Sequence, residues 1–175
     1  MKSQAGRNIL ITGANTGIGR QTALKLAAQG ASLFLAGRSE ERTRPVMDEA
    51  RAAGAERVEF IALDLGDLTS VRSAAQSLLQ FDVPLHVLLN NAGLAASKGA
   101  TAQGFEIAFG VNHLGHYLLT ELLLPCIEAS APSRIVIVAS KAHYRVKALD
   151  LESLHKPTSS PTGYPEYCVS KLCNV

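Results

Sequence analysis

The chain has 175 residues, a length that suits one domain with its own hydrophobic core. Hydrophobic residues make up 47% of the sequence and charged residues 18%, which excludes an intrinsically disordered chain. The net charge is +2, its lysines and arginines are scattered, and aromatic residues are few, so we expect no nucleic-acid partner.

Targeting signals and cysteines indicate where the protein resides. Residues 1–8 are polar and lack the apolar run of a secretory signal. The longest apolar stretch, 107–127, includes Asn112, His116 and Glu121, so it predicts a buried helix of a soluble protein rather than a membrane anchor. The three cysteines form no CxxC pair, which favours free thiols in a reducing compartment. We therefore expect a cytoplasmic protein without a membrane anchor.

The first half of the chain alternates short apolar strands with helices. Gly30 and Gly54 follow two of the helical patterns, as expected for residues that end a helix in the left-handed conformation. In chain order we expect a strand at 8–12, a helix from the following turn to Gly30, a strand at 31–36, a helix at 40–53, a strand at 58–63, and a helix at 67–81 capped by Asp67 or Thr69.

The second half continues this alternation up to a long loop. The unbroken apolar run at 134–139 is typical of a strand covered on both faces. Prolines, serines and a glycine make 141–163 mostly loop, with a short helix at 150–155. In chain order we expect a strand at 85–89, a helix at 101–127 with room for a separate first turn, the strand at 134–139, and a last helix from Tyr164.

Five strands that alternate with helices form βαβ units. Because crossovers between parallel strands are right-handed, the pattern predicts an α/β fold with a Rossmann-type doubly wound parallel sheet. The expected strand order is 3-2-1-4-5, with a ligand at the switch point between the first and fourth strands. We assign residues 1–175 to this single domain.

A glycine-rich turn, TGANTGIG at residues 12–19, lies between the first strand and the first helix. Glycines permit a tight turn and close approach to a pyrophosphate, and the helix start offers free N–H groups and a positive dipole end. An ordinary strand-to-helix turn is the alternative. The candidate dinucleotide-binding residues in this turn are Gly13, Asn15, Thr16, Gly17, Ile18 and Gly19.

Three motifs in a fixed order now identify a resemblance. The turn at 12–19 is followed by NNAG at 90–93 and by Tyr167-x-x-x-Lys171, so the chain resembles the short-chain dehydrogenase/reductase family over essentially its whole length. The stretch VNHLGH at 111–116 resembles the retinol dehydrogenase-like branch. The resemblance implies an oxidoreductase that interconverts an alcohol and a carbonyl with a nicotinamide cofactor, acting on small and lipophilic substrates.

The end of the second strand bears on the choice of cofactor. NAD-selective sites usually place an acidic residue there for the ribose 2′-hydroxyl, and this chain has none. Arg38 stands there instead and can pair with a 2′-phosphate, because a guanidinium fork matches phosphate geometry. We therefore predict NADP(H), with NAD as the alternative cofactor and a solvated surface arginine as the alternative role of Arg38.

Two other strand ends supply further candidates. The resemblance implies that Asp64, followed by Leu65, contacts the adenine, although a loop carboxylate or helix cap is an equal reading of the residue alone. Small residues at Asn91, Ala92 and Gly93 allow the cofactor to approach the backbone. A turn that supports the sheet is the alternative for these three residues, and both roles can coexist.

The proton-transfer pair is Tyr167 and Lys171. Four positions apart on a helix, they lie on the same face. An ammonium stabilises a neighbouring phenolate, so Tyr167 can donate a proton to a carbonyl or accept one from an alcohol. We also expect both residues to contact the cofactor.

The resemblance adds two residues to the catalytic set. Ser140 resembles the family serine that hydrogen-bonds the substrate oxygen, with a simple strand-end hydroxyl as the alternative. Asn112 resembles the helix asparagine that supports a water-mediated proton relay through Lys171, with a helix-kink amide as the alternative. His113 and His116 have a spacing that suits a metal, but no third ligand is evident, so we expect no metal site.

Relatives in the family usually continue beyond the catalytic helix into further strands. The resemblance therefore implies a domain incomplete at its C-terminus, lacking the last strands, with an open edge at the fifth strand and with Lys171 in a fraying final turn. Three hypotheses stay open: a fragment of an active NADP-dependent enzyme, a short form that binds cofactor without turnover, and an interaction module that pairs with another chain. A homo-oligomer is compatible with all three.

Overall fold

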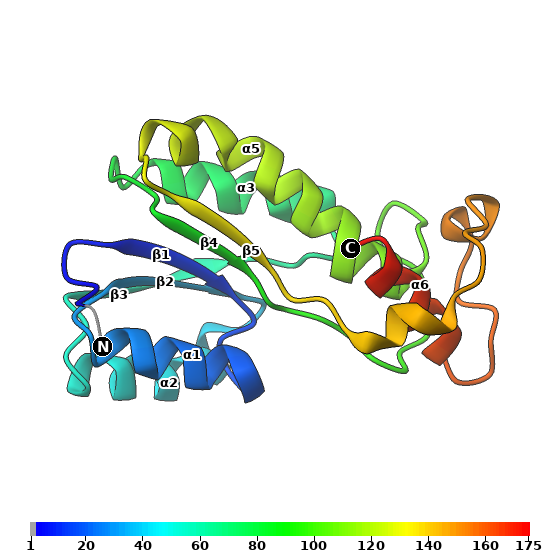
Figure 1. The fold of residues 1–175 in the computed structure, drawn as a ribbon, viewed down its shortest axis with the longest axis horizontal. Helices are drawn as coiled ribbons and strands as arrows, with labels where there is room; N and C mark the ends of the chain where they lie inside the picture. Colours follow the sequence, from blue (N-terminus) through cyan, green and yellow to red (C-terminus); the bar gives the residue numbers. More distant parts are fainter. Residues whose placement is uncertain (1–2) are drawn as a thin grey trace.

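The computed structural model describes residues 3–175, so the first two residues of the N-terminal segment examined for a signal lie outside it. A five-stranded sheet with the order β3-β2-β1-β4-β5 forms the centre of the molecule (Figure 1). Every neighbouring pair is parallel, which confirms the predicted fold class and strand order. The strands are β1 (Asn8–Thr12), β2 (Ser32–Gly37), β3 (Arg57–Ala62), β4 (Val87–Asn90) and β5 (Arg134–Ile137).

Helices cover the two faces of the sheet in pairs (Figure 1). One face carries α1 (Gly17–Ala27) and α2 (Glu40–Ala52), and the other carries α3 (Leu68–Leu79) and α5 (Gly115–Ala129). Of the two residues predicted to cap α3, the structure shows Asp67 in this role, because its Oδ1 accepts from the Thr69 N–H at 2.9 Å. Gly30 and Gly54 follow α1 and α2 with φ of 84° and 108°, as expected of helix-ending glycines.

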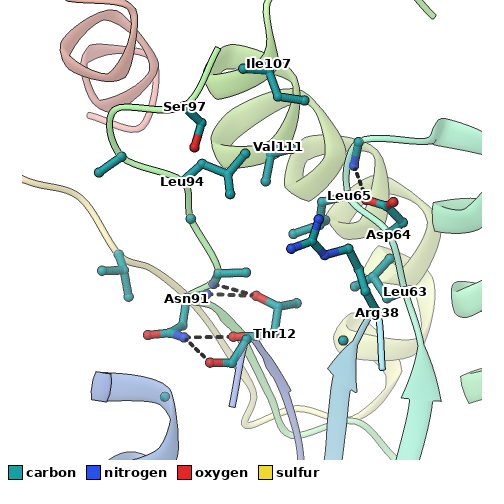
Figure 2. A pocket seen from close by; sticks show the side chains of 18 of the residues that line it. Thr12, Arg38, Leu63, Asp64, Leu65, Asn91, Leu94, Ser97, Ile107 and Val111 are labelled. Atoms are coloured by element: carbon teal, nitrogen blue, oxygen red, sulfur yellow. Dashed lines mark hydrogen bonds between the residues drawn. The ribbon is translucent and has the colours of Figure 1, made fainter. Parts of the chain in front are cut away.

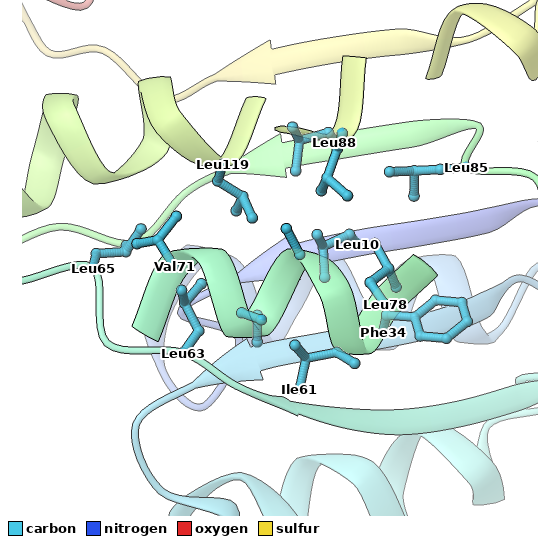
Figure 3. Close-up of a cluster of buried hydrophobic side chains, with 14 of the residues drawn as sticks. Leu10, Phe34, Ile61, Leu63, Leu65, Val71, Leu78, Leu85, Leu88 and Leu119 are labelled. Atoms are coloured by element: carbon cyan, nitrogen blue, oxygen red, sulfur yellow. The ribbon is translucent and has the colours of Figure 1, made fainter. Parts of the chain in front are cut away.

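The core consists of two apolar layers, one on each face of the sheet. Successive residues of a strand point to opposite faces, so Leu10 of β1 packs with Val71 and Leu119 of the α3–α5 layer (Figure 3). Its neighbours Ile9 and Ile11 instead belong to the layer beneath α1 and α2. Burial on both faces explains why the central strands are almost entirely apolar.

The helix predicted for 101–127 begins later than expected. Residues Thr101 and Phe105 form a turn in which the Thr101 N–H donates to the Phe105 carbonyl at 2.8 Å. The carboxylate of Glu106 then accepts from the Phe109 N–H at 2.8 Å and caps the helix. The helical run is α4 (Ile107–Phe109), a π-helical segment η1 (Gly110–Leu114) and α5, so the predicted start at 101 is wrong.

The fifth strand differs from its predicted environment. Ile135, Val136 and Ile137 are 37–50% exposed, so the expectation of cover on both faces is wrong. The reason is position, because among residues 3–175 the strand pairs with β4 alone and forms the edge of the sheet. This exposure agrees with the open edge expected at the fifth strand.

The chain after β5 runs through a long loop to the last helix. The loop contains two short 3₁₀ segments, η2 (Lys141–Arg145) and η3 (Glu152–His155), and the second lies where a short helix was predicted. It leads into α6 (Tyr164–Leu172), which starts at the predicted residue. Within the described part of the chain, no helix combines the length and apolar character needed to cross a membrane.

Candidate active site

A cleft of about 1150 Å³ opens at the carboxyl ends of the strands. It brings together every candidate cofactor residue and three of the four candidate catalytic residues. Asn112 does not line the cleft and is buried behind it. The candidates in the lining are Gly13, Asn15, Thr16, Gly17, Ile18, Gly19, Arg38, Asp64, Leu65, Asn91, Ala92, Gly93, Ser140, Tyr167 and Lys171.

The glycine-rich turn is shaped so that only glycine fits at its closest contact. A Cβ atom on Gly19 would lie 2.3 Å from the Gly13 carbonyl oxygen and 2.5 Å from Nδ2 of Asn91. Gly17, by contrast, has a positive φ of 56° and would place a Cβ in open space. Thr16 at the start of α1 caps no N–H with its side chain, and the first turn holds no acidic residue. The helix therefore offers free N–H groups and positive potential to an anion in the cleft.

The floor of the cleft is a corner where two strand ends are tied together. The hydroxyl oxygen of Thr12 accepts from the backbone N–H groups of Asn91 and Ala92, both at 3.0 Å (Figure 2). In return, Nδ2 of Asn91 donates to the carbonyls of Thr12 and Gly13 at 2.8 and 3.1 Å. Asn91 therefore supports the sheet, as the alternative reading proposed, while its backbone still lines the cleft.

Arg38 and Asp64 line the cleft beyond the ends of β2 and β3 (Figure 2). The Arg38 side chain is exposed, and no acidic residue stands at the end of β2. Asp64 has a local role, because its Oδ1 accepts from the Gly66 N–H at 2.9 Å and stabilises the turn before α3. Asp64 therefore acts as a loop carboxylate, one of the two predicted roles, and it also lines the cleft.

Tyr167 and Lys171 project from the same face of α6 toward the cleft. Nζ of Lys171 lies 5.9 Å from the centre of the Tyr167 ring and donates to the Val138 carbonyl at 2.8 Å. Lys171 is only 4% exposed, and this burial lowers the pKa of its ammonium. The expected fraying of Lys171 is therefore wrong, because packing and the bond to Val138 hold the last turn in place.

Ser140 and Asn112 occupy different places around this pair. Ser140 lines the cleft before η2, where its Oγ accepts from the Ala142 N–H at 3.2 Å. Asn112 lies in the π-helical segment, where its side chain bonds both backbone groups of Leu94, at 2.7 and 3.0 Å. Its Nδ2 also donates to Oγ of Ser170 at 2.8 Å. Asn112 therefore connects the loop after Gly93 with α6.

Comparison with known proteins places this geometry in a family. The profile of the short chain dehydrogenase family matches residues 7–148, most of the chain. The chain belongs to the short-chain dehydrogenase/reductase family. Within it, the retinol dehydrogenase-like resemblance is confirmed, since the chain is 44% identical to retinol dehydrogenase 11 of Homo sapiens over 97% of its own length. It is also 44% identical to dehydrogenase/reductase SDR family member 13 of Homo sapiens, over 100% of its length.

The relatives are longer proteins. A polyprenol dehydrogenase of Mus musculus is 45% identical over 97% of the chain. The chain spans about half the length of these three relatives, from 46% to 54%.

Solved structures agree on the fold. An uncharacterized protein from Mycobacterium paratuberculosis has a TM-score of 0.84 at 38% identity, covering 99% of this chain and 60% of its own. A short-chain dehydrogenase/reductase from Burkholderia phymatum in complex with NAD has a TM-score of 0.75 at 30% identity, covering 99% and 58%. A metagenomic short-chain oxidoreductase in complex with NADP has a TM-score of 0.74 at 27% identity, covering 98% and 73%.

Sequence reasoning missed one wall of the cleft. Leu94, Ser97, Ile107 and Val111 line it between the NNAG motif and the π-helical segment (Figure 2). Two signals were available, since Leu94 directly follows that motif and Ile107 lies four residues before Val111 on one helical face. This family member therefore has an apolar wall opposite its glycine-rich turn.

The two histidines that resembled a metal pair have separate partners. Nδ1 of His113 lies 2.9 Å from Oδ1 of Asn174, in a half-buried contact with the end of the chain. Nε2 of His116 lies 2.8 Å from the hydroxyl oxygen of Thr12, in the interior. The sequence could not show the second contact, because 104 positions separate its two residues.

Proposed function

We propose that this chain binds NADP(H) in the cleft and interconverts a lipophilic alcohol and its carbonyl, with Tyr167 as the acid/base. One observation carries the proposal: the glycine-rich turn and the Tyr167–Lys171 pair line the same cleft. Relatives named retinol dehydrogenase and polyprenol dehydrogenase support an alcohol or carbonyl substrate. Structural neighbours in complex with NAD and with NADP support a nicotinamide cofactor.

The residues present fit such a cofactor. A Cβ on Gly13 or Gly19 would clash with other residues of the chain itself, so the turn is tight and its backbone lines the cleft, as a cradle for a dinucleotide requires. The start of α1 would hold the pyrophosphate, and Arg38 would pair with a 2′-phosphate on the adenine ribose. When bound, the nicotinamide supplies the group that accepts or donates a hydride.

Residues of the chain itself would transfer the proton to or from the substrate oxygen. The Ser140 hydroxyl would hydrogen-bond the substrate oxygen, and the Tyr167 hydroxyl would donate a proton to it or take one from it. Lys171 is held beside the Tyr167 ring by burial and by the Val138 carbonyl, so its position is fixed before substrate arrives. The apolar wall of Leu94, Ile107 and Val111 keeps one side of the cleft dry.

The test compares turnover with cofactor binding. The chain is mixed with NADPH and a panel of long-chain and retinoid-like aldehydes, and NADPH oxidation is followed by absorbance. Tyr167→Phe is expected to lower kcat by at least roughly a hundredfold and to change the Kd for NADP⁺ far less, because the ring stays and only the hydroxyl is lost. Tyr164→Phe is the matched control, because it removes a hydroxyl from the same helix and leaves the Tyr167 hydroxyl in place. Equal rates for Tyr167→Phe and the unmodified chain would overturn the proposed role of Tyr167.

The same assay tests two of the open hypotheses. Turnover of an aldehyde by this chain alone would rule out a form that binds the cofactor without turnover. Turnover that appears only after addition of another protein chain would favour the interaction module.

A further inference from the structure

His116 is a buried histidine that the proposed reaction does not use. It lies in the first turn of α5 and is only 4% exposed. Its ring reaches from the π-helical segment on one side to the end of β1 on the other, where Nε2 meets the Thr12 hydroxyl at 2.8 Å. His116 therefore contacts the residue that ties the floor of the cleft together.

The hydrogen bonds of Thr12 determine which atom holds the proton in this contact. A threonine hydroxyl has one proton to donate and two lone pairs with which to accept. The backbone N–H groups of Asn91 and Ala92, each 3.0 Å away, occupy both lone pairs. The hydroxyl must therefore donate its own proton, and the close acceptor is Nε2 of His116, since the Leu89 carbonyl lies 3.5 Å away.

This assignment fixes the protonation of the imidazole. If Nε2 accepts from Thr12, it carries no proton, and a neutral ring must carry its proton on Nδ1. Nδ1 of His116 lies 3.2 Å from the carbonyl oxygen of Asn112, an acceptor suited to that proton. The same carbonyl also accepts from Nδ2 of Asn174 at 3.0 Å, so His116 and the end of the chain share this acceptor.

We propose that His116 is a positioning residue: a neutral imidazole with its proton on Nδ1, which orients the Thr12 hydroxyl to receive the Asn91 and Ala92 N–H groups. It thereby links the cleft floor to the π-helical segment that contains Asn112. The part of this inference that concerns cofactor affinity rests on the proposed function, because the floor matters for binding only if the cofactor occupies the cleft.

The surroundings of the ring favour its neutral form. Burial is the largest influence and lowers the pKa of His116 to about 4, although the hydrogen bond to Asn112 acts in the opposite direction. The charged or titratable neighbours are Lys171 of α6 and His113 of the π-helical segment, and both disfavour a positive ring. A proton added to Nε2 would point at a hydroxyl that has no lone pair left, so it would break the link to Thr12.

The first test reads the ring directly and needs no cofactor. Nitrogen-15 NMR of the histidine side chains distinguishes a protonated from an unprotonated ring nitrogen. At neutral pH we expect one buried histidine with its proton on Nδ1, assigned to His116 because its signal is missing in His116→Gln. A proton on Nε2, or a doubly protonated ring at neutral pH, would overturn the proposal.

The second test measures the effect on the cleft. His116→Gln supplies an amide oxygen that can accept the Thr12 proton in place of Nε2, whereas His116→Phe keeps a ring but has no acceptor. We expect the Kd for NADP⁺ to stay within about threefold for His116→Gln and to rise roughly tenfold for His116→Phe, the effect of one mispaired buried hydrogen bond.

The two tests separate failure of this inference from failure of the proposed function. Thermal unfolding confirms that each variant is folded before its affinity is compared. Equal affinity of a folded His116→Phe variant and the unmodified chain would contradict the positioning role. If the unmodified chain binds no NADP⁺, the proposed function fails, and the NMR result still decides the protonation of His116.

Discussion

Protonation of His116 should make the folded protein less stable as the pH falls, and His116→Phe should abolish this part of the pH dependence. A histidine in the unfolded chain has a pKa near 6.5, whereas burial lowers the pKa of His116 in the folded state to about 4. As the pH falls, the unfolded state therefore takes up the proton first, so stability is lost between about pH 6.5 and pH 4 and changes no further below that range. Between pH 7 and pH 5 this single group should lower the free energy of unfolding by about 2 kcal/mol.

The measurement is urea unfolding of the unmodified chain and of His116→Phe at a series of pH values. His116→Phe itself changes the free energy of unfolding at neutral pH. We therefore compare, for each protein, how much the free energy of unfolding changes with pH. Other groups, such as His86, whose pKa burial also lowers, titrate in both proteins and cancel in the difference. We expect the free energy of unfolding to fall by about 2 kcal/mol more in the unmodified chain than in His116→Phe between pH 7 and pH 5. Parallel pH profiles for the two proteins would refute the buried, neutral state of His116.

Three further outcomes follow from the geometry. Gly19→Ala should weaken NADP⁺ binding at least tenfold in calorimetric titration, because the added methyl would lie 2.3 Å from a carbonyl of the same turn; unchanged affinity would contradict the cradle. Arg38→Asp should weaken NADP⁺ binding roughly ten- to hundredfold and leave NAD⁺ binding unchanged, whereas Arg57→Asp at the opposite end of the sheet should change neither affinity; an unchanged preference would remove Arg38 from cofactor selection. Leu123→Ala, at a fully buried position, should cost about 3–5 kcal/mol in urea unfolding, and Leu79→Ala, at a 45% exposed position, far less; similar costs would mean that the described core is incorrect.

The sheet and the cleft could be predicted because their signals are local. Alternation of strands and helices determines a parallel sheet, and the carboxyl ends of parallel strands meet along one edge. Arg38, Asp64 and Asn91 each follow a different strand, so the topology alone brings them to the same cleft. Tyr167 and Lys171 were predictable as a pair because helical periodicity places them on one face.

The helical segment before α5 could not be predicted, because it depends on contacts made in the folded state. Residues near Thr101 do not exclude a helix by composition, and the turn forms through its bonds with Phe105. The π-helical segment packs tightly at both ends. A Cβ on Gly110 would lie 2.1 Å from the Thr101 side chain, and one on Gly115 would lie 2.5 Å from the Leu65 carbonyl. The spacing of residues in the sequence does not show these close contacts between segments.

The environment of strand β5 and the partner of His116 also could not be predicted from the local sequence. The apolar run of β5 indicates a strand with two covered faces, but cover depends on which other elements pack there. His116 looked like a member of an i, i+3 pair with His113, whereas the structure places its ring against Thr12, far away in the chain. The side-chain partners of a buried polar residue are a property of the packed core, and they become visible only in the structure.

A backbone NMR titration of the chain with NADP⁺ shows whether the cleft at the ends of β1 and β4 binds a nicotinamide dinucleotide. We expect saturable shifts of the amide signals of Gly13, Gly17, Gly19 and Ala92, with weaker shifts on titration with NAD⁺. The absence of any shift at millimolar NADP⁺, or saturable shifts confined to residues far from the cleft, would contradict binding in this cleft.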